Sequence, residues 1–175
     1  MGKSGGKYLP LKSDSHLLLM PRFLGNIEAK VDSKGRIFFP AVFRKVLQSA
    51  SEERIVLRKD VFQSCLVVYP ERVWNEQMDY LRSRLNRWNG RHQQLFRQFV
   101  SDAERLEFDS NGRILIPKRF LQMAGIVTAV RCIGMGDTIE LWSSSAIEDS
   151  MMDGEAFGQA LEELLNENES HDVTR

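Results

Sequence analysis

A nine-residue segment rich in charged and turn-forming residues occurs twice in the chain. Residues 32–40 read DSKGRIFFP and residues 109–117 read DSNGRILIP, so six of the nine positions are identical. Each copy holds one arginine, Arg36 or Arg113, and the first copy also holds Lys34. A guanidinium can bond two acceptors at once, on a phosphate or on the edge of a guanine base. The repeated segments therefore have the chemistry of an anion-binding or nucleic-acid-binding site.

The same arginines have a second possible role inside the fold. Arg36 could bond Asp32, and Arg113 could bond Asp109, so that each guanidinium only holds its own turn together. The second copy has Asn111 in place of the lysine, which makes its turn less basic. A contact with DNA is therefore less strongly indicated for the second arginine than for the first.

Turn chemistry positions each arginine. The aspartate can accept hydrogen bonds from amides ahead of it, and the glycine can adopt a positive φ. Three apolar residues and a proline follow the arginine, which predicts a short buried strand that ends at the proline. Amphipathic residues then predict a short helix. The turn-forming residues are Asp32, Gly35 and Pro40 in the first copy and Asp109, Gly112 and Pro117 in the second.

Strand-like segments flank both copies. Residues 23–31 lead into the first turn, and residues 54–58 and 65–69 are predicted to pair as a hairpin after the short helix. In the second copy, residues 129–133 and 138–142 take the corresponding places around a glycine-rich turn. The two copies remain alignable to the last strand, so the chain contains an internal repeat.

Two further helical patterns lie outside the repeats. Between the copies, a helix that starts at Pro70–Glu71 carries apolar residues on one face as far as Trp88, and Asn89–Gly90 separates it from a shorter helix. Regular apolar spacing favours core or partner-helix contacts over stacking on bases. Residues 155–169 are predicted to form an amphipathic acidic helix, which could cover a neighbouring subunit or pack within its own chain. The apolar residues are Trp74, Met78, Leu81, Leu85, Trp88, Leu95, Phe96 and Phe99, then Phe157, Leu161, Leu164 and Leu165.

The zero net charge of the 175 residues conceals a division along the chain. Residues 1–100 carry 18 Lys and Arg against 9 Asp and Glu, whereas residues 101–175 carry 6 against 15. Such an asymmetry suggests a face for an anionic partner, although two solvated faces of unlike charge would give the same counts. No apolar run approaches the roughly 18 residues of a membrane span. We expect no membrane partner and a cytoplasmic location.

Enzymatic chemistry is not indicated. His16, His92 and His171 have no triad or metal-ligand spacing around them, and no phosphate-binding glycine loop occurs. Cys65 and Cys132 stand alone in apolar segments, which predicts buried reduced thiols, with a metal site or a disulfide as the less favoured alternatives. We expect no catalytic site, no metal, no cofactor and no small-molecule substrate.

Several separated motifs occur along the chain in a fixed order. They are Phe23-Leu24-Gly25, then Asp32-x-Lys34-Gly35-Arg36 and Pro40, then Tyr69-Pro70, then Asp109-x-x-Gly112-Arg113 and Pro117, then Glu140-Leu141-Trp142. Together these motifs closely resemble the MraZ family, whose members are bacterial transcriptional regulators built from two SpoVT/AbrB-like units. The resemblance covers roughly residues 20–165.

This resemblance implies both a fold and a function. The fold would be α+β, with two SpoVT/AbrB-like swapped-hairpin repeats forming a pseudo-twofold β-barrel with flanking helices. The protein would be a nucleoid-associated homo-oligomeric ring that binds double-stranded DNA at direct repeats in the promoter of the division and cell-wall gene cluster. Arg36 would be the DNA-contacting arginine, with Lys34 beside it and Arg113 as its counterpart in the second copy.

The sequence also suggests a division into domains and a competing function. We expect a flexible basic tail at residues 1–21, the first repeat with its following helices at 22–98, the second repeat at 99–152, and an acidic C-terminal helix and tail at 153–175. The alternative function is a structural oligomeric assembly protein without DNA binding. A gel shift on the DNA upstream of the protein's own gene would distinguish the two functions.

Overall fold

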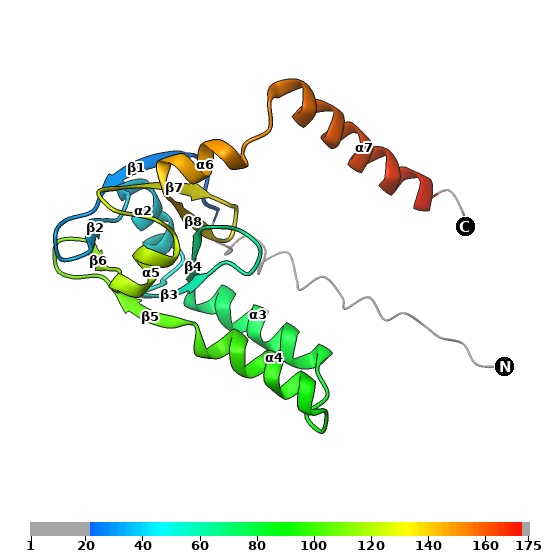
Figure 1. Cartoon of the computed structure of the whole chain (residues 1–175), viewed down its shortest axis with the longest axis horizontal. Coiled ribbons are helices and arrows are strands. Elements are labelled where there is room, and N and C mark those ends of the chain that lie inside the picture. Colours follow the sequence, from blue (N-terminus) through cyan, green and yellow to red (C-terminus); the bar gives the residue numbers. More distant parts are fainter. Residues whose placement is uncertain (1–21, 173–175) are drawn as a thin grey trace. The chain divides into compact units, whose positions relative to one another are not determined.

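The computed structural model describes residues 22–172, so the predicted tail at residues 1–21 lies outside the described residues. By its contacts the chain divides into one unit up to Ser144 and a second from Ser145 onward. The first unit holds both sequence repeats. Each repeat has the order strand, strand, helix, strand, strand (Figure 1).

The first repeat consists of β1 (Asn26–Lys30), β2 (Arg36–Phe38), α2 (Ala41–Ser49), β3 (Arg54–Lys59) and β4 (Leu66–Pro70). Two helices follow, α3 (Glu71–Arg84) and α4 (Gly90–Ser101). The second repeat consists of β5 (Glu104–Glu107), β6 (Arg113–Leu115), α5 (Lys118–Met123), β7 (Ala129–Gly134) and β8 (Ile139–Trp142). The chain continues with α6 (Ser144–Ser150) and α7 (Gly154–Asp172).

The two repeats exchange strands with each other. Six strands form one sheet in the order β1-β7-β8-β4-β3-β5, and β2 pairs with β6 in a separate ribbon. Replacing each strand by its counterpart in the other repeat reverses this order and leaves the pairing unchanged. The symmetry of the pairing extends to single residues, because Ile37 pairs with its own counterpart Ile114 in the ribbon. The predicted hairpin of β3 and β4 is confirmed.

The predicted α+β fold with two repeats is present, but its sheets do not close into the predicted β-barrel. The six-stranded sheet ends at β1 and β5, and the β2–β6 ribbon is a second sheet, linked to the end of β1 by an isolated bridge between Val31 and Ile37. The physical reason lies in the repeated segment. A tight turn reverses the chain after β1, and the ribbon strands have three residues each before the chain reaches Pro40 or Pro117, whose ring nitrogen has no hydrogen to donate to a ladder.

The main core lies between the six-stranded sheet, the ribbon and helices α2 and α5. Phe43 of α2 and Phe120 of α5 occupy equivalent places in the two repeats, and both are fully buried. Ile37 and Ile114 close the core from the ribbon side. Burying a side chain of this size stabilises the fold by about 2 kcal/mol, so the core fixes the ribbon against the sheet.

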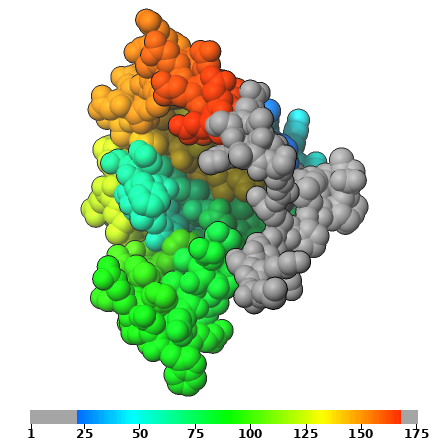
Figure 2. Space-filling model, turned by 90° about the vertical axis from the view of Figure 1, so that its right-hand side faces the viewer, coloured from blue at the N-terminus to red at the C-terminus, as the bar shows by residue number. Residues whose placement is uncertain are grey.

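Helices α3 and α4 form a hairpin that extends from the first unit as a protrusion (Figures 1 and 2). At its base Trp74 stacks on Phe99 with ring centroids 5.2 Å apart. This hairpin covers the outer face of β3 and β4, which explains why β4 is apolar at every position. The predicted apolar face beyond Arg84 is wrong, because α3 ends there and Trp88 is 96% exposed.

Both cysteines are buried and free, as the sequence predicted. Burial raises the pKa of each thiol, Cys65 and Cys132, to about 12. In the second unit, the predicted C-terminal helix is present as α7, and its apolar residues Phe157, Leu161, Leu164 and Leu165 are exposed.

Candidate nucleic-acid interface

The first repeated turn, residues 32–36, is named loop 1. Oδ1 of Asp32 accepts hydrogen bonds from the backbone amides of Lys34 and Arg36, both at 2.9 Å. Oδ2 of Asp32 accepts a hydrogen bond from Nε of Arg36 at 2.7 Å. Gly35 closes the turn with a φ of +87°, which suits a residue without a β-carbon. One carboxylate thus holds both the backbone of the turn and the side chain of its arginine.

The second repeated turn, residues 109–113, is named loop 2 and has the same geometry. Asp109 accepts from the amides of Asn111 and Arg113 at 2.9 Å and from Nε of Arg113 at 2.7 Å. Gly112 has a φ of +75°. The six identical positions of the repeated segment therefore reproduce one turn twice.

These hydrogen bonds also affect the aspartate carboxyls. The backbone amide of Arg36, its guanidinium and the amide of Lys34 all favour the ionised form of Asp32 and lower the pKa of that carboxyl below 3.8. The amide and guanidinium of Arg113 lower the pKa of Asp109 in the same way. Both carboxylates are therefore charged at neutral pH and neutralise part of the charge of the neighbouring arginine.

Each loop is bonded to the other repeat. The carbonyl oxygen of Gly35 accepts from the amide of Ile116 at 2.9 Å, and that of Gly112 accepts from the amide of Phe39 at 3.2 Å. The loops lie at opposite ends of the short β2–β6 ribbon, because the strands are antiparallel and each loop precedes one of them. The strand exchange thus fixes the two loops relative to each other.

The two arginines share the outer face of the ribbon. Arg36 pairs with Leu115, and Phe38 pairs with Arg113, so these four side chains lie on the face opposite the buried Ile37. Phe38 and Leu115 are 62% and 55% exposed. The guanidinium carbon of Arg113 lies 5.6 Å from the centre of the Phe38 ring. The face combines two cations with two exposed apolar side chains.

Each arginine bonds its aspartate through only one of its three guanidinium nitrogens. The side chains of Arg36 and Arg113 are 32% and 23% exposed. Nε of each bonds the aspartate, and among the described residues 22–172 no hydrogen bond or ion pair engages the terminal nitrogens, Nη1 and Nη2. Lys34 and Asn111 are exposed at the tips of the two loops. The structure therefore places Arg36 and Arg113 on the same face of the β2–β6 ribbon, and Lys34 at the end of the ribbon that carries loop 1.

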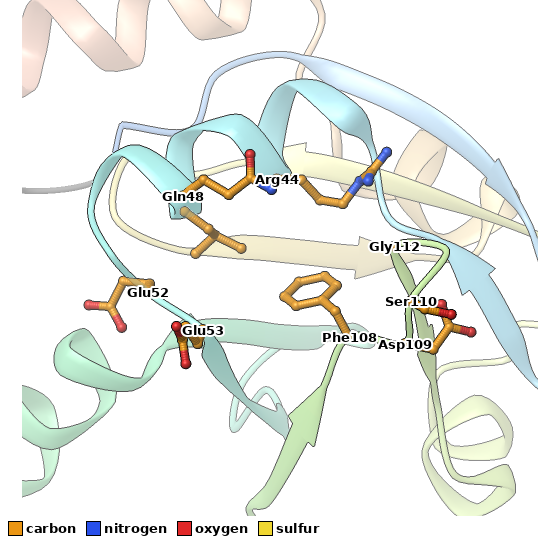
Figure 3. A pocket seen from close by; sticks show the side chains of 9 residues that line it. Arg44, Gln48, Glu52, Glu53, Phe108, Asp109, Ser110 and Gly112 are labelled. Carbon is orange, nitrogen blue, oxygen red and sulfur yellow. The ribbon is translucent and has the colours of Figure 1, made fainter.

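One cation near loop 2 was missed by sequence reasoning. Arg44, from α2 of the first repeat, lines a cavity of about 410 Å³ together with Gly112 of loop 2, and its guanidinium lies beside that glycine (Figure 3). Its Nε donates to the carbonyl oxygen of Phe39 at 3.1 Å. The helical pattern alone placed Arg44 on a short helix, and only the strand exchange brings that helix to the opposite loop.

Within residues 22–172, no group of three or more His, Cys, Asp or Glu side chains could hold a metal ion. Over the same residues, the helices are too short or too polar to cross a lipid bilayer.

Comparisons with known proteins agree with the repeat. The profile of the MraZ protein family, described as antitoxin-like, matches twice, over residues 22–97 and 99–171. The transcriptional regulator MraZ of Bacteroides fragilis is 60% identical over 148 residues, covering 85% of this chain and 94% of that protein. The regulator MraZ of Bacteroides thetaiotaomicron is 58% identical over 156 residues, covering 89% of this chain and 100% of that protein.

A more distant relative extends the same match. The transcriptional regulator MraZ of Christiangramia forsetii is 31% identical over 156 residues, again covering 89% of this chain and 100% of that protein. The matches span both copies of the repeat and the helices between them. The chain therefore belongs to the MraZ family, a non-enzymatic family of transcriptional regulators.

Proposed function

We propose that this protein binds double-stranded DNA sequence-specifically through the outer face of the β2–β6 ribbon and its two loops. Arg36 and Arg113 are the proposed base or phosphate contacts, and Lys34 is a proposed phosphate contact. The target is a set of direct repeats in the promoter of the division and cell-wall gene cluster. The proposal extends the regulatory role of the family to named residues of this chain.

The observation that carries the proposal is how the two guanidiniums are hydrogen-bonded. Each is oriented through Nε by an aspartate at 2.7 Å, while its terminal nitrogens have no hydrogen bond among the described residues. An arginine held in this way loses little conformational freedom when it bonds DNA. Its two terminal nitrogens can still donate together to O6 and N7 of a guanine or to a phosphate.

The shape of the reading element supports the same function. The major groove of B-DNA accepts a two-stranded antiparallel ribbon as well as an α-helix. The exposed face of the ribbon carries Phe38 and Leu115 between the arginines, and apolar side chains can contact the methyl group of thymine. Loop cations at the ends of the ribbon would then reach phosphates on the two sides of the groove.

Charge is distributed in a way that suits an anionic partner. Residues 22–144 carry 20 Lys and Arg against 14 Asp and Glu, a net charge of +6, whereas residues 145–175 carry 1 against 9, a net charge of −8. Residues 145–175, the second unit, thus hold nearly all of the negative excess of residues 101–175. The zero net charge does not argue against DNA binding, because the ribbon lies in the basic unit.

One ribbon offers few contacts, so affinity requires several copies. We propose a cytoplasmic, nucleoid-associated homo-oligomeric ring in which subunits engage successive direct repeats. The second contact then benefits from the effective concentration set by the first, provided that the DNA spacing matches the subunit spacing.

The test is binding to duplex DNA from upstream of the protein's own gene, measured by fluorescence anisotropy at several salt concentrations. Arg36→Ala is expected to weaken binding by roughly tenfold or more and to reduce the salt slope by about one unit. Arg87→Ala, an exposed arginine between α3 and α4, is the matched control and should leave the dissociation constant unchanged. Wild-type binding equal to that on unrelated DNA would refute sequence-specific recognition.

The alternative function, a structural oligomeric assembly protein without DNA binding, has one observation in its favour. Both arginines bond an aspartate of their own turn, as a purely structural role requires. In that case Arg36→Ala would lower the stability of the fold, and the wild-type protein would not shift the upstream DNA at any salt concentration.

A further inference from the structure

The symmetry of the two repeats is broken at one position beside the loops. Phe43 of α2 and Phe120 of α5 are equivalent core residues, so the next residues, Arg44 and Leu121, are also equivalent. The first repeat thus has a guanidinium where the second has an apolar side chain. Leu121 is buried, whereas Arg44 is partly exposed.

Strand exchange places each of these residues against the loop of the other repeat. A β-carbon built on Gly35 would lie 3.3 Å from Cδ1 of Leu121, and one built on Gly112 would lie 2.7 Å from Cζ of Arg44. Loop 1, which has Lys34, therefore packs against an apolar residue. Loop 2, which has Asn111 instead, packs against a cation.

Arg44 is held over loop 2 without being neutralised there. Nε donates to the carbonyl oxygen of Phe39, and no carboxylate among the described residues forms an ion pair with this guanidinium. The guanidinium lies beside Gly112. Figure 3 shows Glu52 and Glu53 at the other end of the cavity from Gly112. Glu52 is engaged instead by Arg72, whose Nε lies 3.5 Å from it.

From this geometry we infer that Arg44 is a phosphate-binding residue of loop 2 and supplies the cation that Asn111 lacks. Each end of the ribbon then presents two cations: Arg36 with Lys34 at loop 1, and Arg113 with Arg44 at loop 2. The inference rests on the proposed DNA-binding function. Its consequence is that loop 2 is a full partner in DNA binding although its own sequence is less basic.

The test moves the charge from the helix to the loop. Arg44→Gln is expected to weaken binding to the upstream duplex about tenfold and to reduce the salt slope by about one unit. Adding Asn111→Lys in the same chain should restore both, because lysine at this exposed position reproduces loop 1. Lys45→Gln, an exposed lysine next along α2, is the control and should change neither quantity.

Arg44→Lys separates the charge of Arg44 from its structural hydrogen bond, because lysine keeps the positive charge but lacks the planar group that donates to the carbonyl oxygen of Phe39. It should bind DNA within about twofold of the wild type, with an unchanged salt slope. Circular dichroism and oligomer size are measured for every variant.

Three results would overturn the inference. If Arg44→Gln binds like the wild type while Arg36→Ala does not, Arg44 touches no DNA and the proposed function stands. If Arg44→Gln weakens binding but neither Asn111→Lys nor Arg44→Lys preserves it, the role of Arg44 is structural. If Arg36→Ala also binds like the wild type, the proposed function itself fails.

Discussion

Loop 1 and loop 2 have the same shape and different electrostatic surroundings. In both, one aspartate accepts two amide hydrogen bonds at 2.9 Å and one guanidinium hydrogen bond at 2.7 Å, and one glycine has a positive φ. The residues that set this shape are identical in the two copies. The residues that set the charge, at positions 34 and 111 and at 44 and 121, differ.

The difference shows how a duplicated unit can keep its geometry while its contacts diverge. Loop 1 carries its second cation on its own tip, at Lys34. Loop 2 is bordered by a cation from the other repeat, Arg44. The unit of function is therefore the pair of exchanged repeats, because the loop of a single repeat would lack the residue that packs against its glycine, Leu121 or Arg44.

Glycine substitutions should separate the two loops most strongly. A β-carbon on Gly35 would lie 2.8 Å from the carbonyl oxygen of Ile116, which cannot move without disturbing the hydrogen bond from the amide of Ile116 to Gly35. On Gly112 it would press on the side chain of Arg44, which can move. We expect Gly35→Ala to lower the free energy of unfolding by about 3 kcal/mol and Gly112→Ala by about 2 kcal/mol.

These values would be measured by urea unfolding at one protein concentration. Gly125→Ala is the control, because Gly125 has a φ of +64° and nothing within 4 Å of an added β-carbon. It should lose only about 1 kcal/mol, the cost of the left-handed backbone itself. Equal losses of unfolding free energy for Gly35→Ala and Gly112→Ala would mean that both glycines are packed against equally rigid groups, contrary to the comparison.

Exchanging the tip residues should sharpen the comparison next. Lys34→Asn gives loop 1 the tip of loop 2 without the neighbouring arginine, so we expect binding about tenfold weaker and a salt slope lower by about one unit. Asn111→Lys gives loop 2 three nearby cations and should strengthen binding by a similar factor. Anisotropy titrations on the upstream duplex measure both. Unchanged slopes in both variants would place the tips away from phosphates.

Lowering the pH should change the stability contributed by the two loops equally, and this is the smallest of the expected effects. The folded state lowers the pKa of Asp32 and of Asp109 below 3.8, so each carboxylate stabilises the fold above that pH and loses its contribution as the pH falls through the lowered pKa. Asp32→Asn and Asp109→Asn should each be less stable than the wild type at neutral pH. The deficit should shrink as the solution is acidified below pH 3.8.

Urea unfolding at a series of pH values measures these two deficits. Because the hydrogen-bond distances of the two carboxylates are the same, the two curves should superimpose. A clear difference between them would show that loop geometry, and not only charge, has diverged.

Local residue chemistry made much of this structure predictable. The turns follow from an aspartate that can bond amides ahead of it and a glycine that can take a positive φ, and the short strands follow from apolar residues before a proline. The β3–β4 hairpin and both core helices follow from apolar periodicity. These features need only neighbouring residues, so the sequence contains their causes.

Two kinds of feature were less predictable: those where local signals compete with each other, and those where distant residues come together. The apolar spacing continued the predicted helix to Trp88, but α3 ends at Arg84. The side chain of Asn86 accepts a hydrogen bond from the amide of Trp88 in the turn that follows, and the side chain of Asn89 caps the start of α4. The sheets do not close into the predicted β-barrel, because each ribbon strand has only three residues. The proximity of Arg44 to loop 2 follows only from the exchange of strands between repeats.

The orientation of the ribbon toward DNA can be measured directly by crosslinking. Phe38 lies between the two arginines on the outer face, and Trp88 is more exposed but lies between α3 and α4. Each would be replaced in turn by p-benzoylphenylalanine, and the purified protein would be irradiated with the upstream duplex. The account predicts a crosslink to DNA from position 38 and none from position 88. A crosslink from position 88 with none from position 38 would contradict it.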